Sequence, residues 1–191
     1  MKTLIYSSIF SLLFLTACSS DSNKTQSIAA SDTASSKTIT TGSSEKGAVS
    51  TAALLSSYLK LKNALTTDND KGAAAAGSEM VAAFSSFDKK SLTQEQSKAY
   101  ADIQDDAKEH AEHIEANVGN IAHQREHFDI LSKDMYDLVK LLGANQLLYV
   151  DHCSMYNNNK GAIWLSEVKD IKNPYLGKVM PTCGTVKEEL K

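Results

Sequence analysis

Apolar residues recur at steps of three and four between residues 48 and 142, and no proline interrupts this stretch. Such spacing is typical of helices with one buried face. Both prolines of the chain, Pro174 and Pro181, come later. Because short polar connections separate the periodic segments, the sequence predicts an all-α fold, an antiparallel four-helix bundle. The four expected helices cover about residues 48–66, 70–87, 92–118 and 120–142.

The remaining segment, residues 144–191, lacks this periodicity. Its short apolar runs are broken by Asn, Gly and Pro, as in NNNKG and NPYLG, which are typical of turns. The run QLLYVD is compatible with a short strand or an extended segment. Long irregular segments in compact domains are usually held by specific contacts. We therefore expect this segment to be irregular, loop-rich and packed along the bundle, with Trp164 as an apolar anchor.

The N-terminus has the pattern of a secretory signal peptide of the lipoprotein type. MKTLIYSSIFSLLFLTAC contains one Lys, then an apolar run from Leu4 to Leu15, then small residues. The run is short for a helix that spans a bilayer. The ending LTAC resembles a bacterial lipobox, so we predict that residues 1–17 are removed and that lipid on Cys18 anchors the protein to a membrane. The alternative is an ordinary signal peptide that contains Cys18.

The next segment, residues 18–47, is rich in Ser, Thr, Asp, Lys and Ala and has almost no large apolar side chain. Such a composition predicts a disordered tether that leads to the folded domain, residues 48–191. The expected location is the cell envelope, on the periplasmic face or at the outer-membrane surface. The net charge is −3 and Lys and Arg do not cluster, so the sequence gives no support for nucleic-acid binding.

The histidines of the chain lie in one third of its length. His123 and His127, in HQREHF, are four residues apart, which is the spacing of a two-histidine metal ligand pair on one helix face. The alternative for both is an exposed or boundary position. His110 and Gln124 are expected to be buried polar groups, hydrogen-bonded to each other or to the backbone. The five histidines are His110, His113, His123, His127 and His152.

Two further stretches, HCSM and MPTC, bring sulfur-containing residues together as Cys153 with Met155 and Met180 with Cys183. Thiolate and thioether ligands favour Cu(I). A Cys153–Cys183 disulfide is the first alternative, and it would close a loop of about thirty residues and stabilise the fold by roughly 3–4 kcal/mol. In the second alternative, the methionines only fill gaps in the core. The residues alone leave these alternatives open.

Four segments together resemble the domain of unknown function numbered three-three-four-seven. This family occurs in bacterial periplasmic lipoproteins and at the C-terminus of adaptor proteins of copper/silver-type heavy-metal efflux pumps. The resemblance extends over about residues 48–186, but Ser154 replaces the proline of the usual Cys-Pro-Met motif. The segments are YLKLKNAL (58–65), HIEANVGNIAHQREHFDILS (113–132), LYVDHCSMYNNNKGAIWLS (148–166) and IKNPYLGKVMPTCGTV (171–186).

The resemblance implies a non-enzymatic protein that binds a soft metal ion, with copper as Cu(I) expected, in heavy-metal efflux or resistance. A heavy-metal efflux complex or a metallochaperone is the implied partner. The alternative is an envelope module for protein–protein interaction with a structural Cys153–Cys183 disulfide and no metal. No catalytic constellation can be singled out in the sequence. The implied metal ligands are His123, His127, Cys153, Met155, Met180 and Cys183.

Overall fold

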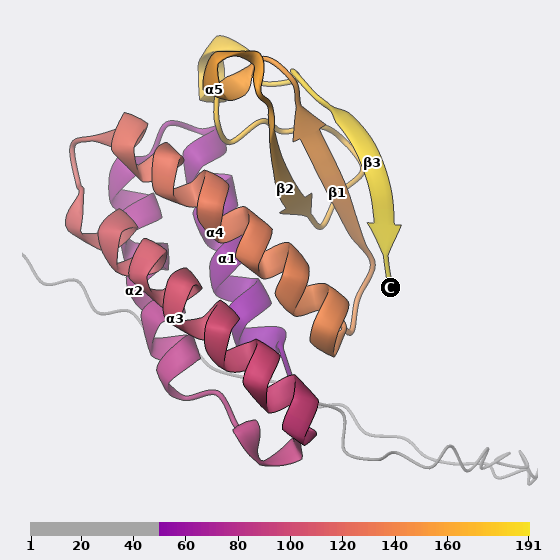
Figure 1. The fold of residues 1–191 in the computed structure, drawn as a ribbon. Helices are drawn as coiled ribbons and strands as arrows, with labels where there is room; N and C mark the ends of the chain where they lie inside the picture. The colour runs from indigo at the N-terminus through magenta and orange to yellow at the C-terminus, as the bar shows by residue number, and fades with distance from the viewer. Residues whose placement is uncertain (1–49) are drawn as a thin grey trace, which may run out of the picture. The chain divides into compact units, whose positions relative to one another are not determined.

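The computed structural model describes residues 50–191 of the chain (Figure 1). The expected signal peptide, the lipidated Cys18 and the tether at 18–47 lie outside this part. No helix among the described residues combines the length and the apolarity that crossing a bilayer requires.

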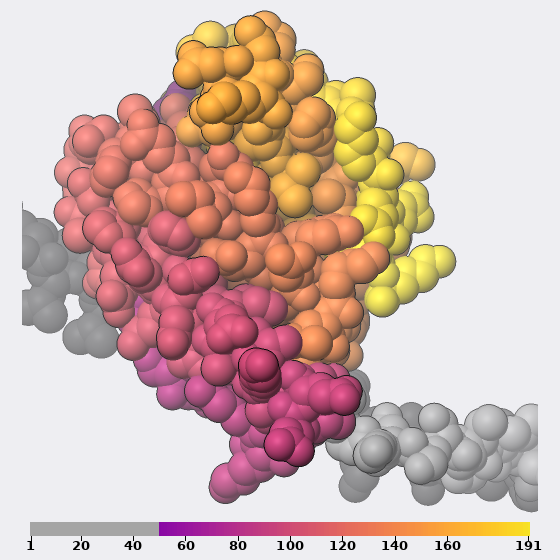
Figure 2. Space-filling view, viewed as in Figure 1, coloured from indigo at the N-terminus to yellow at the C-terminus, as the bar shows by residue number. Residues whose placement is uncertain are grey.

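Four long helices make up most of the described part, as the periodicity of the sequence predicts. Each helix packs against the next one in the chain, from α1 to α4. Figure 2 shows the side chains of α4 filling the space between α3 and the C-terminal part of the chain. The helices are α1 (Ala52–Thr66), α2 (Asp70–Ser85), α3 (Gln94–Ala116) and α4 (Ile121–Leu142).

Side-chain caps explain where three of these helices begin. The Asn69 side chain accepts a hydrogen bond from the third residue of the first turn of α2, and Asn120 does the same for α4. At the start of α3, Thr93 and Gln96 form a reciprocal capping box, in which each side chain accepts from the backbone N–H of the other residue. The three caps satisfy N–H groups that a helix leaves without partners at its start.

The helices enclose a continuous apolar core. Tyr58 of α1 lies at its centre, stacked on Phe128 of α4 with 5.4 Å between the ring centroids. The Tyr58 hydroxyl also bonds to the Ser132 hydroxyl at 2.8 Å and accepts from the Leu165 N–H at 3.0 Å. Trp164 is fully buried in the same cluster, as expected of an anchor for the C-terminal segment. The core therefore joins the helices to the last third of the chain.

The C-terminal segment contains a sheet, so the prediction of an all-α fold is too narrow. Its three antiparallel strands lie in the order β2-β1-β3, with β2 beside α4 (Figure 1). The central strand β1 pairs with β2, which is close in sequence, and with β3, which lies much further along the chain. Local sequence patterns do not encode the pairing of β1 with β3. The strands are β1 (Leu148–Cys153), β2 (Ala162–Ser166) and β3 (Thr185–Leu190).

The connection between β1 and β2 has an unusual backbone. The single turn labelled α5 (Tyr156–Asn159) contains three consecutive asparagines in the left-handed region, with φ of 53°, 56° and 65°. Asparagine enters this region at a lower cost than most residues do. The Asn-rich stretch therefore forms a tight reversal directly after β1. Two short 3-10 turns, η1 (Lys89–Ser91) and η2 (Gly177–Val179), complete the elements.

Candidate metal centre

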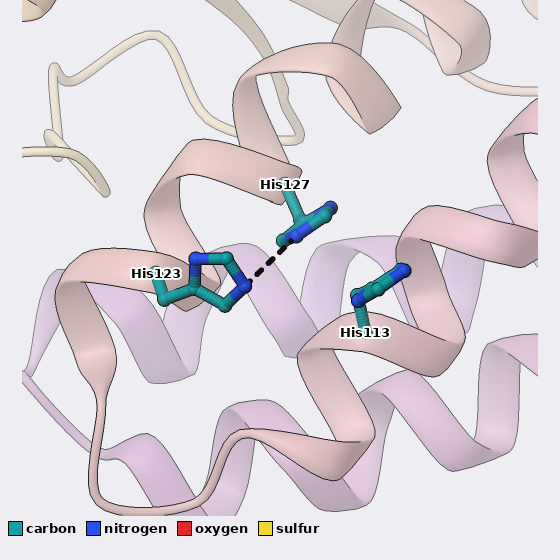
Figure 3. A group of neighbouring side chains, drawn as sticks. All are labelled: His113, His123 and His127. Atoms are coloured by element: carbon teal, nitrogen blue, oxygen red, sulfur yellow. Dashed lines mark hydrogen bonds between the residues drawn. The ribbon is translucent and has the colours of Figure 1, made fainter.

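Three histidines from two helices meet near the connection between α3 and α4 (Figure 3). His113 lies in the last turn of α3, and His123 and His127 lie in the first two turns of α4. One ring nitrogen of each lies within 4.8 Å of the others. Within residues 50–191, this is the group of three His, Cys, Asp or Glu side chains close enough to hold one metal ion.

The α3–α4 hairpin brings the three rings together. Its turn is short, because α3 ends at Ala116 and α4 begins at Ile121. Gln124 is fully buried, and its side-chain amide donates to the carbonyl oxygens of Asp70 and Ile114, both at 3.0 Å. The expectation that Gln124 bonds to the backbone is thereby confirmed. These bonds tie α4 to the end of α3 and to the start of α2, and so fix the helices that carry the histidines.

His127 is the centre of the cluster. Its Nε2 lies 3.1 Å from Nε2 of His123, and its Nδ1 lies 3.0 Å from Nδ1 of His110 on α3. Its ring also stacks on the ring of His113, with 4.3 Å between centroids and 2° between planes. His110 is partly buried and bonds to His127 rather than to Gln124. The cluster therefore has four histidines, of which three bring one ring nitrogen each within 4.8 Å of the others.

The environment of His127 favours its neutral form. Burial, and after it the neighbouring histidines, lower the pKa of His127 to about 4. Burial also lowers the pKa of His110. A neutral imidazole carries one N–H and one lone pair, and metal ions bind through the lone pair. At neutral pH His127 is therefore in the protonation state that metal binding needs.

The hydrogen bonds form a chain that ends on a carboxylate. Nδ1 of His123 lies 3.0 Å from Oε2 of Glu126, so this nitrogen donates and Nε2 of His123 carries the lone pair. Carboxylates that accept from the outer nitrogen of a ligand histidine orient the ring and raise its basicity. Glu126 is thus placed as such a partner for His123.

The donor set fits a transition-metal ion of borderline softness. Three imidazoles suit zinc, copper and nickel, and they leave a further position open for water or another ligand. The stacked rings of His113 and His127 hold their in-plane lone pairs in two parallel planes, which do not meet at one ion. A shared ion therefore requires one ring to turn, and His113 is exposed at the surface, where a turn meets little resistance.

The six residues named by the sequence fall into separate places. His123 and His127 join the histidine cluster, whereas neither cysteine belongs to it. Cys153 ends β1, where it is buried, and its Sγ lies 3.1 Å from Sγ of Cys183. Met155 and Met180 are both exposed, with 51% of Met155 accessible to solvent. The thiols thus form a second cluster.

His113 is the functional candidate that the sequence prediction missed. The periodicity of α3 places it on the flank of the apolar stripe but does not fix how that flank is turned toward α4. The available signal was the short connection after Ala116, since a tight hairpin sets the last turn of one helix against the first turns of the next. Counting back from that connection places His113 beside the first turn of α4, which carries His123.

The histidine cluster lies within the range that matches a known family, whereas the two cysteines lie outside it. The model of a family described as "Protein of unknown function (DUF3347)" matches residues 54–146, which confirms the resemblance over that range; the segments 148–166 and 171–186 lie beyond it. The matched range includes the histidine cluster and stops before β1, so that Cys153 and Cys183 lie beyond it. No curated protein and no solved structure matches the chain.

Proposed function

We propose that this chain, which belongs to the DUF3347 family through residues 54–146, is a non-enzymatic protein that binds copper at His113, His123 and His127. The observation that carries the proposal is the convergence of three imidazole nitrogens within 4.8 Å on two adjacent helices. Helix-borne ligands with a bonded partner such as Glu126 are held more precisely than ligands on loops.

The chemistry of the donors selects the ion and its oxidation state. Among divalent first-row ions, Cu²⁺ has the highest affinity for nitrogen sites. The resemblance implies Cu(I), but the thiol and thioether ligands that Cu(I) prefers lie outside the histidine cluster. An all-imidazole site is therefore proposed for Cu²⁺, with zinc as its main competitor.

The proposed setting is the cell envelope. Lipid on Cys18 would hold the protein at a membrane, and the segment 18–47 would give the domain reach. In that setting the protein would buffer copper or pass it to a heavy-metal efflux complex or a metallochaperone. An exposed site with an open coordination position is compatible with transfer, because an incoming ligand can attack before the last histidine leaves.

Titration of the metal-free protein with Cu²⁺ tests the proposal. We expect one ion per chain, with an electron paramagnetic resonance signal typical of nitrogen ligation. His127→Ala should weaken binding by at least about tenfold, the effect expected for loss of one ligand or its partner. The matched control is His152→Ala, because His152 lies on β1 and outside the cluster. Absence of binding, or equal affinities for the two variants, would overturn the proposal.

The second candidate is an envelope module for protein–protein interaction whose C-terminal part is fixed by a Cys153–Cys183 disulfide. The observation that favours it is the 3.1 Å contact between the two sulfurs. In this case the protein has no need of a metal. A purified chain with oxidised thiols, no affinity for Cu²⁺ or Zn²⁺ and unchanged behaviour of His127→Ala would support this candidate over the first.

A further inference from the structure

The two thiols of the C-terminal sheet face each other across neighbouring strands. Cys153 is the last residue of β1, and Cys183 lies two residues before β3. The register pairs His152 with Thr185, so the thiols come at the same end of the β1–β3 ladder. Their sulfurs are 3.1 Å apart, and a disulfide bond of about 2.05 Å requires them to approach by only about 1 Å.

We propose that Cys153 and Cys183 form a thiol–disulfide exchange site, in which the partly exposed Cys183 reacts first with an external disulfide and the buried Cys153 then closes the internal bond. This inference is independent of the histidine cluster and of copper binding. It gives the C-terminal sheet a covalent modification that depends on the redox conditions outside the inner membrane.

The loop that carries Cys183 is held in place for this reaction. Asn173 is fully buried, and its side-chain amide donates to the carbonyl oxygen of Cys183 at 2.6 Å. The backbone N–H of Asn173 donates to the carbonyl oxygen of Pro181 at 2.8 Å. Bond formation can therefore proceed within the existing backbone, and the strand pairing does not have to change.

The two thiols differ in access and in the groups around them. Cys153 is buried, whereas Cys183 is partly exposed. Burial raises the pKa of Cys153, but the contact with Cys183 and nearby N–H groups of Met155 and Tyr156 outweigh it and lower that pKa overall. The hydrogen bond to Cys153 raises the pKa of Cys183. The buried sulfur is thus the better stabilised thiolate, and the outer sulfur is the one that a reagent can reach.

A groove lies beside the two residues that precede the outer thiol in the chain. It has a volume of about 610 Å³, and Pro181 and Thr182, the two residues before Cys183, form part of its wall. The end of α1 and the segment after β2 form the opposite side, through residues such as Thr66 and Glu167. The partial exposure of Cys183 leaves its thiol open to a small external disulfide.

The reaction balances in two exchanges. In the first, the Cys183 thiolate attacks one sulfur of an external disulfide, the external S–S bond breaks, and one external thiolate leaves and takes up a proton. In the second, the Cys153 thiolate attacks Sγ of Cys183, the mixed disulfide breaks, and the second external thiol leaves. Two protein thiols are oxidised and one external disulfide is reduced to two thiols, so two electrons are transferred. A dithiol reductant reverses both exchanges.

A dithiolate metal site fits the geometry less well. With metal–sulfur bonds of about 2.3 Å, two sulfurs 3.1 Å apart would subtend about 85° at the ion. That angle is smaller than the tetrahedral angle and far from the linear arrangement of a two-coordinate ion. The contact distance therefore favours bond formation between the sulfurs over a shared ion.

The test uses the full chain with Cys18→Ser, so that two thiols remain, in buffers of oxidised and reduced glutathione. In the chain that keeps both Cys153 and Cys183, intact mass after acid quenching should show two free thiols or an internal disulfide. The fraction with the disulfide should change with the ratio of oxidised to reduced glutathione. Cys153→Ser should accumulate one glutathione adduct at Cys183. Cys183→Ser should acquire its adduct at least about tenfold more slowly, because Cys153 is buried.

Two controls keep the outcome decisive. In denaturant, both variants should react at similar rates, so that the difference between them reports the fold. In the chain with both thiols, a pulse of limiting maleimide should label Cys183 first, which needs no substitution at either cysteine. Equal rates for the two folded variants, first labelling at Cys153, or no internal disulfide at any buffer ratio would overturn the proposal.

Discussion

The α3–α4 hairpin and the C-terminal sheet are held in the molecule in different ways. The hairpin relies on apolar helix faces, on caps and on the two backbone bonds of Gln124. The sheet shares the apolar core through side chains such as Trp164, and in addition buried polar groups of α1 bond to it, namely Lys62 with Glu167 at 2.7 Å and the Tyr58 hydroxyl with the Leu165 N–H at 3.0 Å. The histidine cluster should therefore tolerate changes in α1 that loosen the cysteine pair.

Removal of the buried charge on α1 should have the largest effect. Lys62 is fully buried, pairs with Glu167 and lies near the buried Asp151, whose pKa burial raises to about 6. Lys62→Met leaves these acidic groups without their positive partner. Breaking a fully buried pair costs about 3–5 kcal/mol, and because Glu167 is partly exposed the lower end of that range, about 3 kcal/mol, applies here. We expect the free energy of unfolding to fall by about that amount, with amide exchange accelerating in β1 and β2 before α3 and α4.

Lys60→Met is the matched control for this experiment. Lys60 also lies on α1 and pairs with Glu79 at 2.6 Å, but both side chains are exposed. Exposed pairs contribute about 0–1 kcal/mol, so the control should change stability little. If Lys62→Met and Lys60→Met lower the free energy of unfolding equally, or if the amides of α3 and α4 exchange before those of β1 and β2, the sheet does not depend on Lys62 more than the hairpin does.

Loss of the Tyr58 hydroxyl should have a smaller effect on the same side of the comparison. Tyr58→Phe keeps the stacking on Phe128 but leaves the Ser132 hydroxyl and the Leu165 N–H without this partner. An unsatisfied buried group costs about 1–3 kcal/mol, which urea unfolding can measure. Faster amide exchange at Leu165 should accompany the loss.

Tyr136→Phe serves as the control, because the Tyr136 hydroxyl bonds only to the carboxylate of Glu188 at the surface. Its loss should change stability by less than about 0.5 kcal/mol. An equal effect of the two substitutions would show that the Tyr58 hydroxyl does not hold the sheet to the helices.

The same contrast explains which parts of the structure the sequence predicts. Helix periodicity and capping residues are local, so the four helices and the shared face of His123 and His127 follow from spacing alone. The position of His113 depends on how α3 is rotated against α4, and the apolar pattern does not determine that angle to the precision of one side chain. A pair within one helix is therefore predictable, whereas a ligand from a second helix requires the hairpin geometry.

The sheet is less predictable from local sequence patterns than the helices are. β1 and β3 pair although about thirty residues separate them, and the loop between them contains β2 as well. The sequence predicts a turn at NNNKG, but it does not show that all three residues Asn157–Asn159 take the left-handed conformation. The cysteine pair was nevertheless predictable as an alternative, because two cysteines in one domain of a chain with an expected export signal have each other as natural partners.

The smallest expected effect concerns pH, and it has opposite signs in the two regions. His127 has a pKa of about 4 in the fold, below the ordinary value of 6.5. Between these values the unfolded chain binds the proton more readily, so His127 lowers stability as pH falls from about 6.5 to about 4. Because His127 is partly exposed, we expect only about 1 kcal/mol over this window. His127→Gln should remove that loss, as urea unfolding at pH 7, 5.5 and 4 would measure.

Asp151 provides the contrast within the sheet. Burial raises its pKa from 3.8 to about 6, so the folded state binds the proton more readily, and Asp151 raises stability as pH falls from about 6 to about 4. As the pH is lowered, the free energy of unfolding of Asp151→Asn should therefore decrease relative to that of the wild type. The free energy of unfolding of His127→Gln should increase relative to that of the wild type. If both variants change the pH dependence of stability in the same direction, either His127 or Asp151 does not have the environment that the fold assigns to it. Asp134 is then the next group to substitute, because burial also raises its pKa to about 6.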